Sequence, residues 1–172
     1  MTKTFRLTMA QLNPTVGDIA GNADQARQAW AEGKANGADL VALPEMFLVG
    51  YQTQDLIAKP AFVADAIDQL HALARDCADG PALSIGGPAV EEERLYNAYY
   101  TLRGGEIAAA AVDVLPQEPP VNGDPLLDYK GDNLMVTPHI AWGTLTARQA
   151  AIDELTANIA AFLDGEERCR VV

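Results

Sequence analysis

The sequence predicts an α/β fold in which helices flank a mixed sheet, and three observations support this. Short segments alternate apolar and polar residues, which is typical of strands with one buried face. Longer segments repeat apolar residues at helical spacing. Two alternating segments are joined by a short acidic turn, which indicates an antiparallel hairpin. With 172 residues, 49% of them hydrophobic and 21% charged, the chain is large and apolar enough to bury a core.

The first part of the chain is predicted to form a strand, a helix and a second strand. Phe5, Leu7 and Met9 alternate with polar or small residues, so we expect them on the buried face of the first strand. Asn22 is a candidate N-cap for the helix that follows, because its side chain can accept a hydrogen bond from a free backbone N–H. Residues 40–43 form an apolar run that predicts a buried strand.

The middle of the chain carries the clearest periodic patterns. Residues 61–77 repeat apolar side chains at helical spacing and end before a Gly-Pro pair, which predicts a helix with one buried stripe. Residues 83–87 and 96–102 are predicted strands, and the acidic turn at 91–93 joins them into a hairpin. Residues 107–115 predict one further strand.

The last third of the chain begins with a proline-rich stretch. Residues 116–127 hold four of the ten prolines and are predicted to be an extended loop. A short strand is expected at 134–137, and Thr144 is a candidate cap for a long helix. The apolar stripe of that helix consists of Ala151, Ile152, Leu155, Ile159 and Phe162. We expect this stripe to cover an open sheet face.

Composition excludes several classes of protein. The net charge of -12 repels nucleic acid backbones and anionic lipid, so we expect neither nucleic acid nor membrane partners. Two cysteines make no disulfide framework, and no apolar run is long enough to span a bilayer. The residues before the first predicted strand lack the apolar stretch of a signal peptide, which favours the cytoplasm. No cluster of ligand residues predicts a metal site.

Residues 1–108 carry a set of motifs in a fixed order. The run at 10–18 reads AQLNPTVGD, LPEMF follows at 43–47, and Gly50-Tyr51 and the run LYNA at 95–98 complete the set. These motifs resemble the nitrilase superfamily, nearest to the glutaminase domain of glutamine-dependent NAD synthetases. The resemblance implies a half of a nitrilase-type sandwich, with a mixed sheet and helices.

The nitrilase resemblance also implies a catalytic set that this chain holds only in part. In that family a cysteine attacks the amide, a glutamate moves protons and a lysine stabilises the tetrahedral intermediate. Glu45 matches the glutamate. The cysteine and the lysine are expected later in sequence, where this chain no longer resembles the family. Cys77, Cys169, Lys59 and Lys130 lack the expected surroundings, so we interpret them as structural or solvated.

Residues 109–172 carry a second, unrelated set of motifs. The run AVDVL at 111–115 leads to EPP at 118–120 and DPL at 124–126, and TPHIAW follows at 137–142. These motifs resemble the C-terminal part of NAD-dependent D-2-hydroxyacid dehydrogenases, nearest to the glycerate or hydroxypyruvate reductases. The resemblance implies a strand, a proline-rich loop, a second strand and a long C-terminal helix.

The dehydrogenase resemblance assigns roles to three residues. His139 matches the histidine that protonates the substrate carbonyl, Glu118 the glutamate that orients it, and Asp113 a residue that contacts the nicotinamide. The chain has no G-x-G-x-x-G motif, which the dinucleotide pyrophosphate needs. We therefore expect no cofactor, and NAD only if the dehydrogenase remnant is functional.

The two resemblances meet at a seam near residues 104–110, where both families place a glycine-rich turn followed by a strand. The sequence thus predicts a fusion of two fragments, 1–108 and 109–172, packed as one compact unit and without a complete catalytic site. Two alternatives stay open. One is residual NAD-dependent D-2-hydroxyacid dehydrogenase activity, and the other is vestigial glutamine amide hydrolysis. We also expect self-association through the exposed sheet face.

Overall fold

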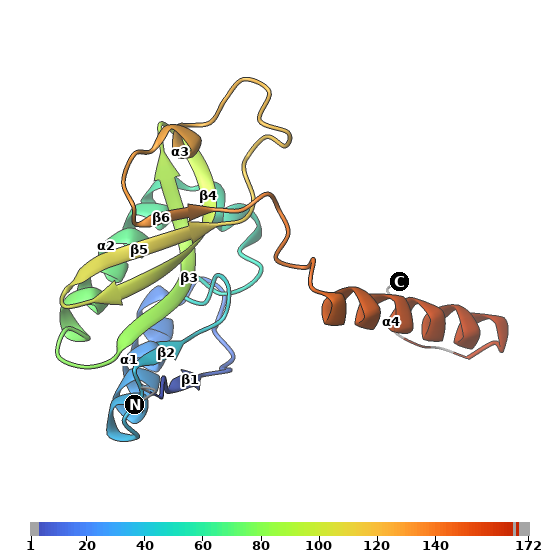
Figure 1. Cartoon of the computed structure of the whole chain (residues 1–172), viewed down its shortest axis with the longest axis horizontal. Coiled ribbons are helices and arrows are strands. Elements are labelled where there is room, and N and C mark those ends of the chain that lie inside the picture. Colours follow the sequence, from blue (N-terminus) through green and yellow to red (C-terminus); the bar gives the residue numbers. More distant parts are fainter. Residues whose placement is uncertain (1–3, 167, 169–172) are drawn as a thin grey trace. The chain divides into compact units, whose positions relative to one another are not determined.

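The computed structural model describes residues 4–166 and 168, and it divides the chain into two compact units. The first unit runs to Thr137 and the second begins at Pro138. The seam near 104–110 therefore lies inside the first unit. We describe each unit by itself (Figure 1).

The first unit contains a six-stranded sheet. Its strands are β1 (Leu7–Met9), β2 (Leu40–Ala42), β3 (Ala82–Glu91), β4 (Arg94–Arg103), β5 (Glu106–Val112) and β6 (Leu134–Val136). Its helices are α1 (Ile19–Ala35), η1 (Gln54–Ala58), α2 (Pro60–Asp76) and α3 (Pro125–Asp128). The second unit contains α4 (Leu145–Leu163). All strands predicted from the sequence are present, although β5 ends three residues before the predicted strand does.

The sheet is mixed, as the sequence predicts, and its strands follow one another in chain order. β1, β2 and β3 are parallel to one another. β4 pairs antiparallel with both β3 and β5. β6 pairs parallel with β5. Glu92 and Glu93 form the two-residue turn of the β3–β4 hairpin and both have positive φ, as this type of turn requires. Strands from both sides of the seam therefore belong to one hydrogen-bonded sheet.

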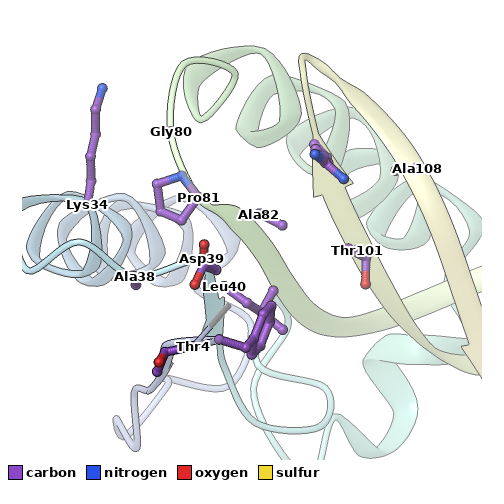
Figure 2. Close-up of a pocket in the computed structure, with 12 residues that line it drawn as sticks. Thr4, Lys34, Ala38, Asp39, Leu40, Gly80, Pro81, Ala82, Thr101 and Ala108 are labelled. Atoms are coloured by element: carbon purple, nitrogen blue, oxygen red, sulfur yellow. The ribbon is translucent and has the colours of Figure 1, made fainter. Parts of the chain in front are cut away.

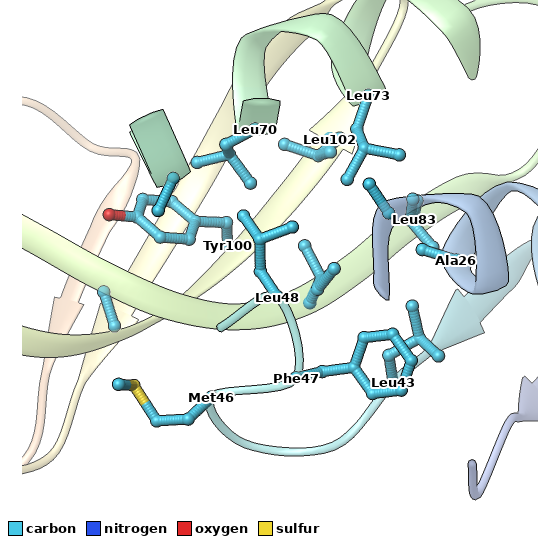
Figure 3. Packing of buried hydrophobic residues seen from close by; sticks show 14 of the residues in the cluster. Ala26, Leu43, Met46, Phe47, Leu48, Leu70, Leu73, Leu83, Tyr100 and Leu102 are labelled. Carbon is cyan, nitrogen blue, oxygen red and sulfur yellow. The ribbon is translucent and has the colours of Figure 1, made fainter. Parts of the chain in front are cut away.

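Helices α1 and α2 pack on one face of this sheet and enclose the core (Figure 3). α1 approaches β2 closely, because a Cβ at Gly33 would lie 2.3 Å from Cγ2 of Val41. The largest side chains that are fully buried include Phe47, Leu48, Leu73, Leu83, Ile85 and Leu102. Burial of this many apolar side chains is the main source of stability for the unit.

The opposite face of the sheet is open within the first unit. Leu7 and Met9 are 50% and 79% exposed, and Met135 of β6 is 63% exposed. The alternation in β1 was expected to bury Phe5, Leu7 and Met9, and this prediction is wrong. The reason is that both helices cover the face that carries Val41, so the apolar side of β1 has no layer against it.

Helix α1 begins three residues before the predicted cap. Asp18 is the N-cap, and its Oδ1 accepts a hydrogen bond from the backbone N–H of Gly21 at 3.0 Å. Asn22 is instead fully buried inside the first turn. Its amide bonds both backbone groups of Thr15 at 2.8 Å and the carbonyl of Leu48 at 3.2 Å. Asn22, which the sequence suggested as an N-cap, thus links the loop before α1 to the loop after β2.

The proline-rich stretch is not extended throughout. Asp124 caps the single-turn helix α3, whose first residue is Pro125, and the Asp124 carboxylate accepts a bond from the N–H of Leu126 at 3.0 Å. Proline suits the first helical position because its missing N–H would have no partner there. The prediction of an extended loop overlooked this capping pattern.

In the second unit, Thr144 caps α4 as predicted, and its hydroxyl accepts a hydrogen bond from the N–H of Ala147 at 3.1 Å. Arg168 forms a two-point ion pair with Glu154, at 2.9 and 3.0 Å. Ile152, Leu155, Ile159 and Phe162 are all more than half exposed. Among the described residues, no helix is both long enough and apolar enough to cross a membrane.

Candidate functional site

The best-formed candidate site is built around Glu45, in the loop that follows β2. Backbone hydrogen bonds fix this loop along β3, from the N–H of Leu43 to Ser84 at 2.9 Å and from the N–H of Leu48 to Gly86 at 3.1 Å. A Cβ at Gly86 would lie 2.2 Å from the backbone nitrogen of Met46 and 2.7 Å from Cα of Glu45. Glycine is therefore required at position 86 for the loop to sit where it does.

Two side chains of β4 reach this loop. The Nδ2 of Asn97 donates a hydrogen bond to Oε1 of Glu45 at 2.6 Å. Two residues further along the same face, the hydroxyl of Tyr99 donates to the carbonyl of Leu43 at 2.7 Å. β4 thus holds the Glu45 carboxylate through Asn97 and the Leu43 carbonyl through Tyr99. Burial raises the pKa of Tyr99, so its hydroxyl keeps its proton and remains a donor.

Glu45 and Asn97 lie at the edge of a pocket of about 350 Å³. Its other lining residues are Met46, Gly50, Tyr51, Gln52, Thr53, Gln54 and Ile57. A carboxylate fixed by a carboxamide can accept and return a proton, or hold an N–H of a ligand. The lining residues include no thiol and no ammonium group, so the pocket itself supplies neither a nucleophilic sulfur nor a cation for an oxyanion.

Cys77 is buried at the C-terminal end of α2 and is not among the residues that line this pocket. Burial, with a smaller contribution from the charge of Asp76, raises the pKa of the Cys77 thiol to about 11. A thiol with such a pKa is a poor nucleophile near neutral pH. Cys169 lies outside the described residues. Lys59 is paired with Asp55 at 3.4 Å.

We expect Cys77 to react slowly with iodoacetamide in a Cys169→Ser background. At pH 8 its rate should be about a hundredfold below that of an exposed model thiol, because so little thiolate forms. The rate should rise about tenfold per pH unit until the pH passes about 11. Mass spectrometry of quenched samples measures this. A rate that levels off below pH 9 would show an activated thiol and contradict the structural role.

The dehydrogenase-type residues are divided between the two units, and each is described within its own unit. Glu118 is exposed on the loop after β5 in the first unit, and its Oε1 accepts a bond from the N–H of Leu115 at 2.8 Å. His139 belongs to the second unit, has a positive φ of 54°, and its carbonyl accepts a bond from Nε1 of Trp142 at 2.8 Å. The hydroxyl of Thr137 donates a hydrogen bond to Asp113.

The segment after β5 in the first unit does not fit the pyrophosphate of a dinucleotide. A pyrophosphate needs a glycine-rich turn that leads directly from a strand into a helix N-terminus. β5 is followed instead by the proline-rich stretch, and α3 has only four residues. The described residues also hold no group of three or more side chains suited to bind a metal ion.

A second and larger hollow of about 760 Å³ lies where β1, β2 and β3 begin (Figure 2). Most of its lining residues have small side chains, and Lys34, Asp39 and Arg103 are the charged ones. The Asp39 carboxylate accepts a bond from the N–H of Arg6 at 2.8 Å. Lys34 is held by Asp79 at 2.8 Å. The hollow therefore presents no set of reactive groups.

Asn97, Tyr99 and Gly86 are residues of the Glu45 site to which the sequence analysis assigned no role. Asn97 stands within the recognised LYNA run, yet nothing in one sequence shows that it faces Glu45. Gly86 is the first of a Gly-Gly pair inside a strand, a position where close approach of another backbone is a common reason for glycine. That signal was available in the sequence.

The first unit is thus an α/β unit with a mixed sheet and a carboxylate, Glu45, fixed beside a pocket. The family model described as carbon-nitrogen hydrolase matches residues 6–113, which is more than half of the chain, and the chain belongs to this family. A second model, described as the NAD binding domain of D-isomer specific 2-hydroxyacid dehydrogenases, matches residues 86–141. The two matches overlap at 86–113, around the predicted seam. The predicted pairing of two families is confirmed.

Individual relatives divide the chain in the same way. A glutamine-dependent NAD(+) synthetase of Rhodobacter capsulatus is 60% identical over 112 residues, which are 65% of this chain and 20% of that protein. A glycerate dehydrogenase of Methylorubrum extorquens is 42% identical over 80 residues, which are 46% of this chain and 24% of that protein. The chain therefore spans about a fifth to a quarter of the length of these relatives.

Solved structures confirm the predicted nitrilase-like α/β fold. An amidase from Nesterenkonia sp. superposes with a TM-score of 0.56 at 27% identity, over 67% of this chain and 44% of that one. A glutamine-dependent NAD(+) synthetase from Cytophaga hutchinsonii superposes with a TM-score of 0.62 at 24% identity, over 67% of this chain and 20% of that one.

Proposed function

We propose that this chain is a fusion of two enzyme fragments that lacks a complete catalytic site. The observation that carries the proposal is the pocket at Glu45. It keeps the carboxylate and its carboxamide partner at 2.6 Å, but its lining offers no thiol and no ammonium group. Cys77 is buried away from that lining with a pKa of about 11. A proton carrier without a thiol beside it cannot complete amide hydrolysis by the covalent cysteine route.

The test of this proposal is ammonia release from glutamine. The purified chain and its Glu45→Gln variant should both release ammonia at the rate of a protein-free blank. Glu45→Gln is the matched control because it keeps the shape of the side chain and removes its ability to take a proton. Ammonia release by the parent chain that the substitution abolishes would establish vestigial glutamine amide hydrolysis and overturn the proposal.

The second candidate function is residual NAD-dependent reduction of a 2-hydroxyacid precursor such as hydroxypyruvate. It is favoured by Asp113 and Thr137, which follow the parallel strands β5 and β6 and share a hydrogen bond. Ligands of α/β sheets commonly bind at the carboxyl ends of parallel strands. The missing pyrophosphate turn argues against it. We therefore expect no NADH oxidation with hydroxypyruvate, and NAD belongs to this protein only if that assay is positive.

The partners that we propose follow from charge and from the open sheet face. A net charge of -12 disfavours nucleic acid and anionic membranes, and the cytoplasm is the compartment that we propose. Leu7, Met9 and Met135 present apolar surface that a second copy of the chain would bury. Light scattering that gives the mass of a monomer at all concentrations would contradict self-association.

A further inference from the structure

A buried carboxylate joins the segment after the seam to the hairpin before it. Asp124, only 4% exposed, lies in the segment 113–133 between β5 and β6, which we call the strap. Its Oδ2 is 2.9 Å from Nη1 of Arg94, and the hydroxyl of Tyr96 donates to both of its oxygens at 3.0 and 3.2 Å. Arg94 also bonds the carbonyl of Gly123, at 3.4 Å.

The two sides of this cluster differ in which family models match them. Arg94 and Tyr96 on β4 lie at 86–113, where the carbon-nitrogen hydrolase and dehydrogenase matches overlap, whereas Asp124 is covered by the dehydrogenase match alone. A protein that contained only residues 6–113 of this sequence would have no Asp124. The cluster therefore connects the region where the two matches overlap to the segment that only the dehydrogenase match covers.

Directed hydrogen bonds hold this carboxylate from both sides. Tyr96 and Arg94 bind it from the hairpin, and the N–H of Leu126 binds it from the strap at 3.0 Å. Burial, and then the bond to Asp124, raise the pKa of Tyr96 to about 12, so the phenol remains protonated and a donor. Removing one partner of a buried ion pair is costly, because the remaining charged group stays buried without an opposite charge.

We infer that Asp124 is a clasp that fastens the strap to the β3–β4 hairpin and makes the segment after the seam part of the folded first unit. Within the strap Leu115 and Leu126 pack on the core, but Val121 and Leu127 are exposed, so the directed bonds of Asp124 add to a limited apolar contact. Loss of the clasp should open the strap while the core under α1 and α2 stays folded.

Chymotryptic cleavage within the strap, at Leu127 and Tyr129, tests this inference. Asp124→Asn keeps an oxygen to cap α3 but loses the charge, and we expect cleavage about tenfold faster with unchanged circular dichroism. Arg94→Ala should act similarly. Because the two residues share one contact, the double variant should be cleaved about tenfold faster and not about a hundredfold. Asp128→Asn, an exposed carboxylate on the same short helix, should match the parent.

Two results would overturn the inference. One is cleavage of Asp124→Asn at the parent rate. The other is a double variant whose cleavage rate rises by the product of the two single increases, as it does for independent changes. If Asp124→Asn does not fold, Tyr96→Phe tests the inference in its place, because this substitution removes only one hydroxyl group. Faster strap cleavage in Tyr96→Phe supports the clasp, and cleavage at the parent rate contradicts it.

Discussion

Gly86→Ala should lower the free energy of unfolding by about 3 kcal/mol, because the added methyl cannot be accommodated without moving backbone. The new Cβ would stand 2.2 Å from the backbone nitrogen of Met46 and 2.7 Å from the carbonyl carbon of Glu45. A flexible side chain could rotate away from such a contact, but a backbone held by hydrogen bonds to β3 cannot. Urea denaturation followed by circular dichroism measures the loss.

Gly87→Ala is the matched control, one residue further along β3. A Cβ there would meet nothing closer than the 3.7 Å contact with Leu48, and we expect a change below about 1 kcal/mol. If both alanine variants were equally stable, Gly86 would not be a close-approach position. The placement of Glu45 would then need another explanation.

Asn22→Ala should cost about 2–4 kcal/mol of unfolding free energy. The fully buried amide satisfies the N–H and carbonyl of Thr15 and the carbonyl of Leu48. The carbonyl of Thr15 also accepts a bond from the N–H of Asp18 at 3.2 Å, so alanine would remove the partners of the Thr15 N–H and the Leu48 carbonyl. Each buried group without a partner costs about 1–3 kcal/mol. Because Leu48 follows the Glu45 segment, we also expect the loop after β2 to exchange amide hydrogens faster.

Asn36→Ala serves as the comparison for Asn22. Asn36 donates a similar hydrogen bond, to the carbonyl of Glu32 at 2.9 Å, but it is exposed at the C-terminal end of α1. Water can replace that bond, so the loss should stay within about 0.5 kcal/mol. Equal losses in the two variants would show that burial is not what makes Asn22 important.

The strands and helices could be predicted because their signals are local. The period-two and helical patterns identified β3, β4 and α2, and the acidic turn identified the hairpin. The exposure of Leu7 and Met9 could not be predicted, because alternation shows that a strand has an apolar face but not whether anything covers it. That depends on which side of the sheet the helices occupy.

The candidate site was predictable only in part, for a related reason. Motifs identified Glu45, but its partner Asn97 lies 52 positions away in sequence and meets it only through the pairing of β3 with β4. The same holds for Asp124 and Arg94, which are 30 positions apart. Contacts of this kind depend on sheet order and register, which one sequence does not specify.

The most direct measurement assays one purified sample for both reactions, ammonia release from glutamine and NADH oxidation with hydroxypyruvate. Glu45→Gln and His139→Ala are the respective comparison variants. Our account predicts that the parent chain and both variants match the protein-free blank in each assay. Turnover by the parent chain that either substitution removes would show a working active site and contradict the account.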